Sequence, residues 1–112
     1  MTDNERLARW QGWTYDIEES LWANPIKSKG WSTLEPLPDY LNNDAASCSL
    51  LDTLVAKGYC YAIRHEAGVI GVCIAKDPFI TDAWDIYIQS NTTRNVAIMQ
   101  ACLELEAKNE TA

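Results

Sequence analysis

The sequence is poor in the residue types that build catalytic and metal centres. It holds one histidine, His65, which is expected in an exposed turn, and its four cysteines form no CxxC pair. A zinc site needs about three or four His, Cys or carboxylate ligands, and no such spacing occurs. Phosphate-binding glycine loops and Gly-x-Ser-x-Gly nucleophile contexts are also missing. The sequence therefore predicts a protein that is not an enzyme and binds no metal or cofactor.

Long apolar runs and clustered cations are missing as well. No segment approaches the roughly 20 apolar residues that a membrane span requires, and the N-terminus has no basic region followed by an apolar core. The chain has 9 Lys and Arg against 16 Asp and Glu, a net charge of −7. Because phosphate binding needs clustered cations, we expect no direct nucleic-acid partner and no membrane partner. A cytosolic location follows from these patterns.

The four cysteines are Cys48, Cys60, Cys73 and Cys102. All of them fall at positions whose neighbours are apolar, which predicts small buried side chains in a reducing compartment. Disulfides of a secreted protein are the alternative, but no export signal supports them.

The first third of the chain predicts short elements followed by a long loop. Thr2 and Glu5 form a capping-box pattern for a helix that Gly12 ends. Residues 13–22 are ambiguous: their first half alternates as a strand does, residues 16–22 could instead close a helical turn, and we favour two short strands around an acidic turn. Residues 24–42 contain several prolines and no sustained period, and their apolar residues favour a loop wrapped over a core. This loop holds Ile26, Trp31, Leu34, Leu37, Tyr40 and Leu41.

Residues 43–63 predict a capped helix that runs directly into a strand. Asn43 or Asp44 can cap the first backbone amides, and Gly58 suits the left-handed residue that ends a helix. The expected apolar stripe consists of Cys48, Leu51, Leu54 and Val55, widened by Ala45 and Leu50.

The second half predicts a meander of strands at 59–64, 69–75 and about 81–89, closed by a helix from about residue 92 to 107. The third strand alternates Trp84, Ile86 and Ile88 with more polar residues. The last helix is expected to bury Ile98, Ala101, Cys102 and Leu105 and to leave Glu104 and Glu106 in solvent. Two amphipathic helices and a sheet that is apolar on both faces predict a single α+β domain. The expected fold is an antiparallel sheet of three to five strands with helices on both faces, an α/β/α sandwich.

Tryptophan is the unusual component of this chain, with four of its five copies in the first 31 residues. Such rings either cover a sheet or present a pocket or a partner surface. The candidate binding residues are Trp13, Trp22, Trp31, Tyr40, Glu18 and Glu19. The pairs Glu18/Glu19, Asp82/Asp85 and Glu104/Glu106 do not form acid–base dyads at their spacings and are expected to be surface charge.

Four segments are together similar to one family. They are the Gly12-Trp13 step, residues 37–40 (LPDY), residues 50–59 (LLDTLVAKGY) and residues 91–105 (NTTRNVAIMQACLEL). These features resemble the phage ABA sandwich domain family, small proteins encoded by phages and prophages. The resemblance implies a sheet between helices and implies no catalytic residues. At the Glu18-Glu19 pair and in the 24–36 loop, this chain looks longer than the family pattern.

The leading functional hypothesis is a phage or prophage accessory protein that binds a host protein in the host cytoplasm. An inhibitor of a bacterial defence system, such as a CRISPR effector, is a natural subclass, because acidic surfaces suit nucleic-acid grooves. The alternative is a protein that binds or sequesters a nucleotide-like ligand through the Trp-rich region. The third strand also offers an edge that can pair in a homodimer.

Overall fold

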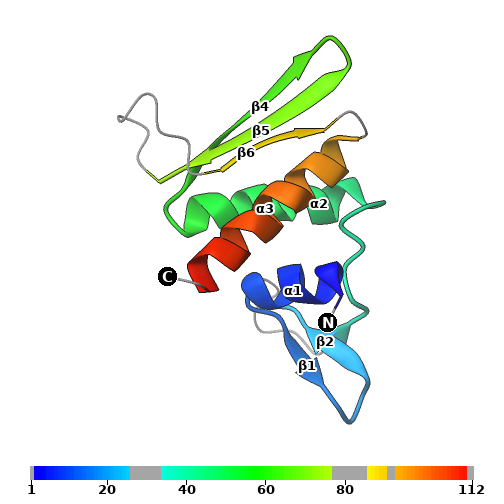
Figure 1. Cartoon of the computed structure of the whole chain (residues 1–112). Coiled ribbons are helices and arrows are strands. Elements are labelled where there is room, and N and C mark those ends of the chain that lie inside the picture. The colour runs from blue at the N-terminus through cyan, green and yellow to red at the C-terminus, as the bar shows by residue number, and fades with distance from the viewer. Residues whose placement is uncertain (1, 26–33, 77–85, 91–92, 111–112) are drawn as a thin grey trace.

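A computed structural model describes residues 2–25, 34–76, 86–90 and 93–110. These residues form three helices and two antiparallel three-stranded sheets, which confirms the expected α+β class and antiparallel pairing (Figure 1). The smaller sheet has the order β1-β2-β3 and the larger has the order β4-β5-β6.

The first helix, α1 (Asp3–Trp10), begins and ends as its sequence predicts. The Thr2 hydroxyl accepts a hydrogen bond from the Glu5 backbone N–H at 3.2 Å, which completes one half of the capping box. Gly12 has a φ of +98°, a left-handed conformation in which a side chain would be strained. The chain therefore turns sharply out of α1 into the first hairpin.

The predicted pair of strands around an acidic turn is confirmed as β1 (Thr14–Asp16) and β2 (Leu21–Ala23). A third strand, β3 (Leu34–Glu35), pairs with β2 inside the segment that was predicted to be a loop. A strand of two residues is too short to show an alternating pattern in the sequence. The pairing of β3 with β2 therefore depends on tertiary contact alone. Ile26 and Trp31 lie outside the described residues.

The second helix, α2 (Asp44–Ala56), also keeps its predicted ends. The Asn43 side chain accepts from the Ala46 N–H at 3.2 Å, and Gly58 has a φ of +91°. The Tyr59 N–H then donates to the Leu54 carbonyl at 2.9 Å, the backbone pattern of a Schellman ending. This ending directs the chain straight into the larger sheet.

The predicted apolar stripe of α2 is wrong at three positions. Ala45, Cys48 and Val55 are exposed, and Val55 keeps 60% of its surface in solvent. The buried positions are Ser47, Leu50, Leu51 and Leu54. These positions follow the i, i+3, i+4, i+7 spacing of one helix face. Because the first of these positions is the polar Ser47, a prediction based on apolar residues alone did not identify this face.

The larger sheet consists of β4 (Cys60–Glu66), β5 (Val69–Ala75) and β6 (Ile86–Ser90). A two-residue turn joins β4 to β5, with positive φ at both Ala67 and Gly68. His65 is exposed as expected, but it lies on β4 and not in the turn. Residues 81–85 of the predicted third strand, including Trp84, lie outside the described residues.

The last helix, α3 (Arg94–Glu110), packs beside α2. Both helices lie on the same side of the larger sheet, with α1 and the smaller sheet beyond them (Figure 1). One hydrophobic cluster joins this sheet face to both helices, and it includes Val72, Ile74, Leu50, Leu54, Ile98 and Leu105. The layering thus differs from the expected sandwich with a helix on each sheet face.

The opposite face of β5 explains why its sequence suggested helices on both sides. It presents the small buried residues Gly71, Cys73 and Ala75. A Cβ on Gly71 would lie 3.7 Å from the Tyr87 hydroxyl, so the ring of Tyr87 on β6 reaches across this face. Small side chains on this face, with Cys73 and Ala75 only 1% and 5% exposed, make β5 apolar on both faces.

The cysteine prediction is correct for half of the set. Cys73 and Cys102 are buried, whereas Cys60 is half-buried and Cys48 is exposed. All four thiols are free. Burial raises the pKa of Cys73 and raises the pKa of Cys102 to about 12, so both stay protonated at neutral pH.

Candidate functional site

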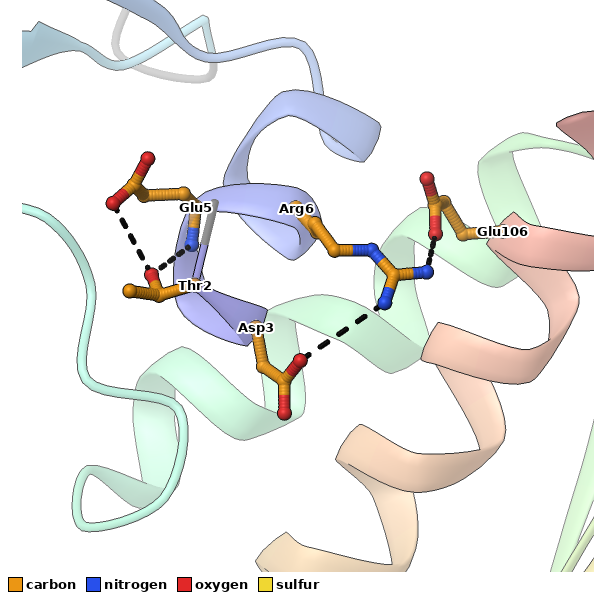
Figure 2. A network of polar contacts seen from close by, with 5 residues as sticks. All are labelled: Thr2, Asp3, Glu5, Arg6 and Glu106. Atoms are coloured by element: carbon orange, nitrogen blue, oxygen red, sulfur yellow. Dashed lines mark hydrogen bonds and ion pairs between the residues drawn. The ribbon is translucent and has the colours of Figure 1, made fainter.

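Side-chain contacts attach α1 to the two helices that support the larger sheet. Arg6 on α1 donates through Nη2 to the Glu106 carboxylate on α3, and its Nη1 lies 4.0 Å from Asp3 Oδ1 (Figure 2). The prediction that Glu106 is a solvent-exposed charge is wrong, because only 9% of the residue is exposed. Glu106 follows Cys102 by four residues, so helical spacing places it on the core face of α3, and only its charge favoured solvent; its partner Arg6 comes from the distant α1.

A polar bridge forms the second attachment. The Gln11 side chain donates to Ser49 Oγ and Thr53 Oγ1 on α2, both at 3.0 Å. Its carbonyl oxygen accepts a hydrogen bond from the Tyr40 hydroxyl. Burial raises the pKa of Tyr40 well above its ordinary value, which keeps the phenol protonated as the donor. Tyr40, a predicted binding residue, is thus fully buried in this bridge.

The described members of the tryptophan group act mainly in packing. Trp13 and Trp22 form a small cluster with Ala8, and each is 7% exposed. The Arg9 guanidinium lies 5.1 Å from the centre of the Trp22 ring, and Lys57 Nζ lies 5.3 Å from the half-buried Trp10 ring. Trp31 lies outside the described residues. Trp13 and Trp22 each line one groove.

The tip of the β1–β2 hairpin is the most exposed apolar feature of the described residues. Ile17 lies in this turn and is 83% exposed. The Asp16 carboxylate accepts from the backbone N–H groups of Glu18 and Glu19 at 3.0 and 3.1 Å, which fixes the turn. The hairpin projects away from the helices (Figure 1). Ile17 and two acidic residues are therefore held together on a protruding, ordered tip, which we call the hairpin tip (residues 16–20).

A groove of about 570 Å³ lies between the end of α1 and the start of α2, and we call it the Trp13 groove. Trp13, Leu37 and Pro38 supply apolar walls, and Glu35 and Asp39 supply carboxylates. Hydrogen bonds from the Asn42 side chain and backbone lower the pKa of Asp39, so its carboxylate stays charged at neutral pH. This volume lies within the range of small-ligand sites.

A second groove of about 470 Å³ runs beside the hairpin. Its walls include Arg9, Tyr15 and Trp22, with Glu5 at the same site. Tyr15 and Trp22 face each other across the strand pair, with ring centres 5.3 Å apart. This arrangement offers one half-exposed aromatic ring and one cation.

Metal chemistry has no support in the parts of the chain that the structure describes, which contain no group of three or more potential ligands. The same residues include no helix long and apolar enough to cross a membrane.

Sequence reasoning found Glu18 and Glu19 at the hairpin tip but missed Ile17. The signal was present, since Ile17 is the one apolar residue between Asp16 and Ser20 in a predicted turn.

Comparison with known proteins gives no match to a family model, a curated protein or a solved structure. The resemblance to the phage ABA sandwich domain family therefore stays a prediction.

Proposed function

We propose that this chain is a non-enzymatic binding protein that docks on a host protein through the hairpin tip. The observation that carries the proposal is the 83% exposure of Ile17 on a turn fixed by Asp16. An isoleucine in water gains about 1.5–3 kcal/mol when it is fully buried, so a partner pocket would make it a strong anchor. Because the turn is already ordered, little conformational entropy is lost on binding.

Charge indicates the kind of partner pocket. Glu18 and Glu19 are exposed beside Ile17, and the whole chain carries a net charge of −7. A complementary site has an apolar centre with Lys or Arg at its rim, and proteins that bind nucleic acid display such cations in their grooves. Together with the phage resemblance, this supports a bacterial nucleic-acid-binding partner in the host cytoplasm, with a CRISPR effector as the first class to test.

The test measures binding to a panel of purified CRISPR effectors by biolayer interferometry. Wild-type protein is compared with Ile17→Ser and with the double variant Glu18→Gln/Glu19→Gln. We expect Ile17→Ser to weaken binding at least about tenfold, as loss of a central anchor does. The double variant should slow association and reduce its salt dependence.

Val55→Ser is the matched control. Val55 is a second exposed aliphatic residue, 60% exposed on α2, and it lies outside the hairpin tip. Its replacement should leave the affinity unchanged. Equal weakening by Ile17→Ser and Val55→Ser, or unchanged binding by Ile17→Ser to a partner that wild type binds, would overturn the role of the tip. No binding across the panel would remove the CRISPR subclass.

A nucleotide-like ligand is the second candidate, and the groove beside the hairpin favours it. A base can stack on the half-exposed Tyr15 while Arg9 approaches a phosphate. Titration with ATP, GTP and cyclic dinucleotides should quench tryptophan fluorescence in wild type and not in Arg9→Gln. An unchanged emission spectrum with every nucleotide at millimolar concentration contradicts this candidate.

Self-association through β6 is a further part of the proposal. Within the described strands β6 pairs only with β5, and we propose that a second copy pairs with it across a two-fold axis. Light scattering after gel filtration should then give a mass that rises from 12.6 kDa towards twice that value with concentration. A constant monomer mass up to millimolar concentration excludes the dimer.

A further inference from the structure

The groove beside the hairpin is lined by two opposite charges that have different partners. Glu5 and Arg9 lie four residues apart on α1, the spacing at which an acidic and a basic side chain often pair. Here the Thr2 hydroxyl donates to Glu5 Oε1 at 3.3 Å, and the Arg9 guanidinium lies 5.1 Å from the centre of the Trp22 ring. The groove therefore offers a ligand an acceptor and a cation at separate points.

The Glu5 carboxylate can accept further hydrogen bonds. A carboxylate has about four lone-pair sites on its two oxygens, and the Thr2 hydroxyl uses one of them. Two adjacent donors on a ligand would suit the two oxygens best. Guanine presents two adjacent donors, N1–H and its N2 amino group, on its Watson–Crick edge. Adenine presents the acceptor N1 beside its amino group, and an acceptor that faces a carboxylate is repelled, so Glu5 favours guanine.

Tyr15 supplies an aromatic surface in the same groove. Its ring is 43% exposed, and its centre lies 5.3 Å from that of the buried Trp22, which supports it from the neighbouring strand. Bases of every type stack on such rings, so Tyr15 contributes affinity and the choice of base is left to Glu5. The volume of about 470 Å³ is within the range of small-ligand sites.

We propose that the groove beside the hairpin selects a guanine nucleotide. This inference rests on the nucleotide-like ligand of the proposed function and names its base. The base stacks on Tyr15, its N1–H and N2 amino group donate to the Glu5 carboxylate, and the Arg9 guanidinium pairs with phosphate. A guanine nucleotide thus meets both charges of the groove, because it carries donors on its base and anionic oxygens on its phosphates.

The experiment measures the affinities of GTP, ITP and ATP by isothermal titration calorimetry. The three nucleotides carry the same triphosphate and differ only in the base. We expect GTP to bind at least about fivefold more tightly than ATP, the lower end for a pair of hydrogen bonds to one base. ITP should lie between them, because hypoxanthine keeps N1–H and lacks the N2 amino group.

Glu5→Gln tests the role of the carboxylate. The variant keeps an acceptor oxygen for the Thr2 hydroxyl, but its amide can also donate to adenine N1. We therefore expect the ratio of GTP to ATP affinity to fall towards one. Glu104→Gln is the control for the change in net charge, since Glu104 is an exposed carboxylate outside the groove, and it should leave the ratio unchanged.

The outcomes separate this inference from the proposed ligand. Equal affinities for GTP and ATP in wild type, or an unchanged ratio in Glu5→Gln, would overturn the selection of guanine and leave a nucleotide-like ligand in place. ITP binding as tight as GTP would overturn the pairing with the N2 amino group. No binding of any of the three at millimolar concentration would remove the nucleotide ligand, and the selection of guanine with it.

Discussion

Arg6 on the first helix and Glu106 on the last form an ion pair across 100 residues of chain, with the Glu106 side chain only 11% exposed. This contact holds α1 against α3 (Figure 2). Breaking a buried pair leaves one charge without its partner, which costs more than the pair contributes in water.

We therefore expect Arg6→Ala to lower the free energy of unfolding by about 1–3 kcal/mol, less than for a fully buried pair because Arg6 is partly exposed. Urea denaturation followed by circular dichroism measures this loss. Glu104→Gln is the control for a carboxylate on the same helix, and it should change stability by less than about 0.5 kcal/mol. An Arg6→Ala midpoint equal to that of wild type would show that the pair contributes nothing.

Ser47 gives a prediction of the opposite sign. Its hydroxyl is buried in α2 and has no hydrogen-bond partner among the described residues. Ser47→Ala removes that group and improves helix propensity, so we expect a gain of up to about 1 kcal/mol in urea unfolding. Ser49→Ala is the comparison, since Ser49 accepts from Gln11, and it should cost about 1 kcal/mol. Destabilisation by Ser47→Ala would indicate that the buried hydroxyl has a partner.

Stability should fall at alkaline pH. The unfolded Cys102 thiol loses its proton near its ordinary pKa of 9.0, whereas the folded thiol keeps it up to a pKa of about 12. Below pH 9 both states are protonated and the thiol has no effect. Between pH 9 and 12 only the unfolded state gains charge, which favours unfolding by about 1.4 kcal/mol per pH unit.

Urea unfolding at pH 8 and pH 10.5 measures this effect. The raised pKa of Tyr40 acts in the same direction above pH 10, the ordinary value of that phenol. Cys102→Ala is the control, and its loss of stability between the two pH values should be about 2 kcal/mol smaller than that of wild type. Equal losses in both proteins would contradict a buried, protonated Cys102.

The four thiols should react in the order of their exposure. Cys48 is exposed, Cys60 is half-buried, and Cys73 and Cys102 are buried. A thiol reagent such as DTNB at pH 8 should give one fast phase, which Cys48→Ala removes, and two thiols should react only after denaturation. Four equally fast thiols would contradict the placement of Cys73 and Cys102 in the interior.

Gly58 tests the ending of α2. Its φ of +91° is strained for a side chain, although a Cβ there would meet no atom within 4 Å. Gly58→Ala should therefore cost about 1 kcal/mol from backbone strain alone, and Gly58→Asn should cost less because asparagine tolerates this conformation. Thermal unfolding of both variants checks the order. Gly58→Ala as stable as wild type would show that the turn relaxes.

Local chemistry in the sequence was sufficient for the ends of the elements. Thr2, Asn43 and Gly58 act on backbone groups within a few residues, so capping and stopping could be predicted and are confirmed. The β1–β2 hairpin and the β4–β5 pair followed from short turns between apolar runs. For the candidate site, the same reasoning reached Glu18 and Glu19, because charges in a predicted turn are expected in solvent.

Only the tertiary structure decided which faces became interior. Ser47 is buried and Cys48 exposed because α2 packs with the face that fits α3 and β4, and a one-residue shift of the stripe changes few apolar residues. Glu106 can be buried because Arg6 pairs with it from the other end of the chain, and Trp13 is buried against Ala8 and Trp22. The sequence by itself thus determined the elements and their boundaries, which depend on interactions within a few residues. Packing between distant segments determined the layers, the buried charge and the grooves, because those free energies depend on surfaces that meet only in the folded chain.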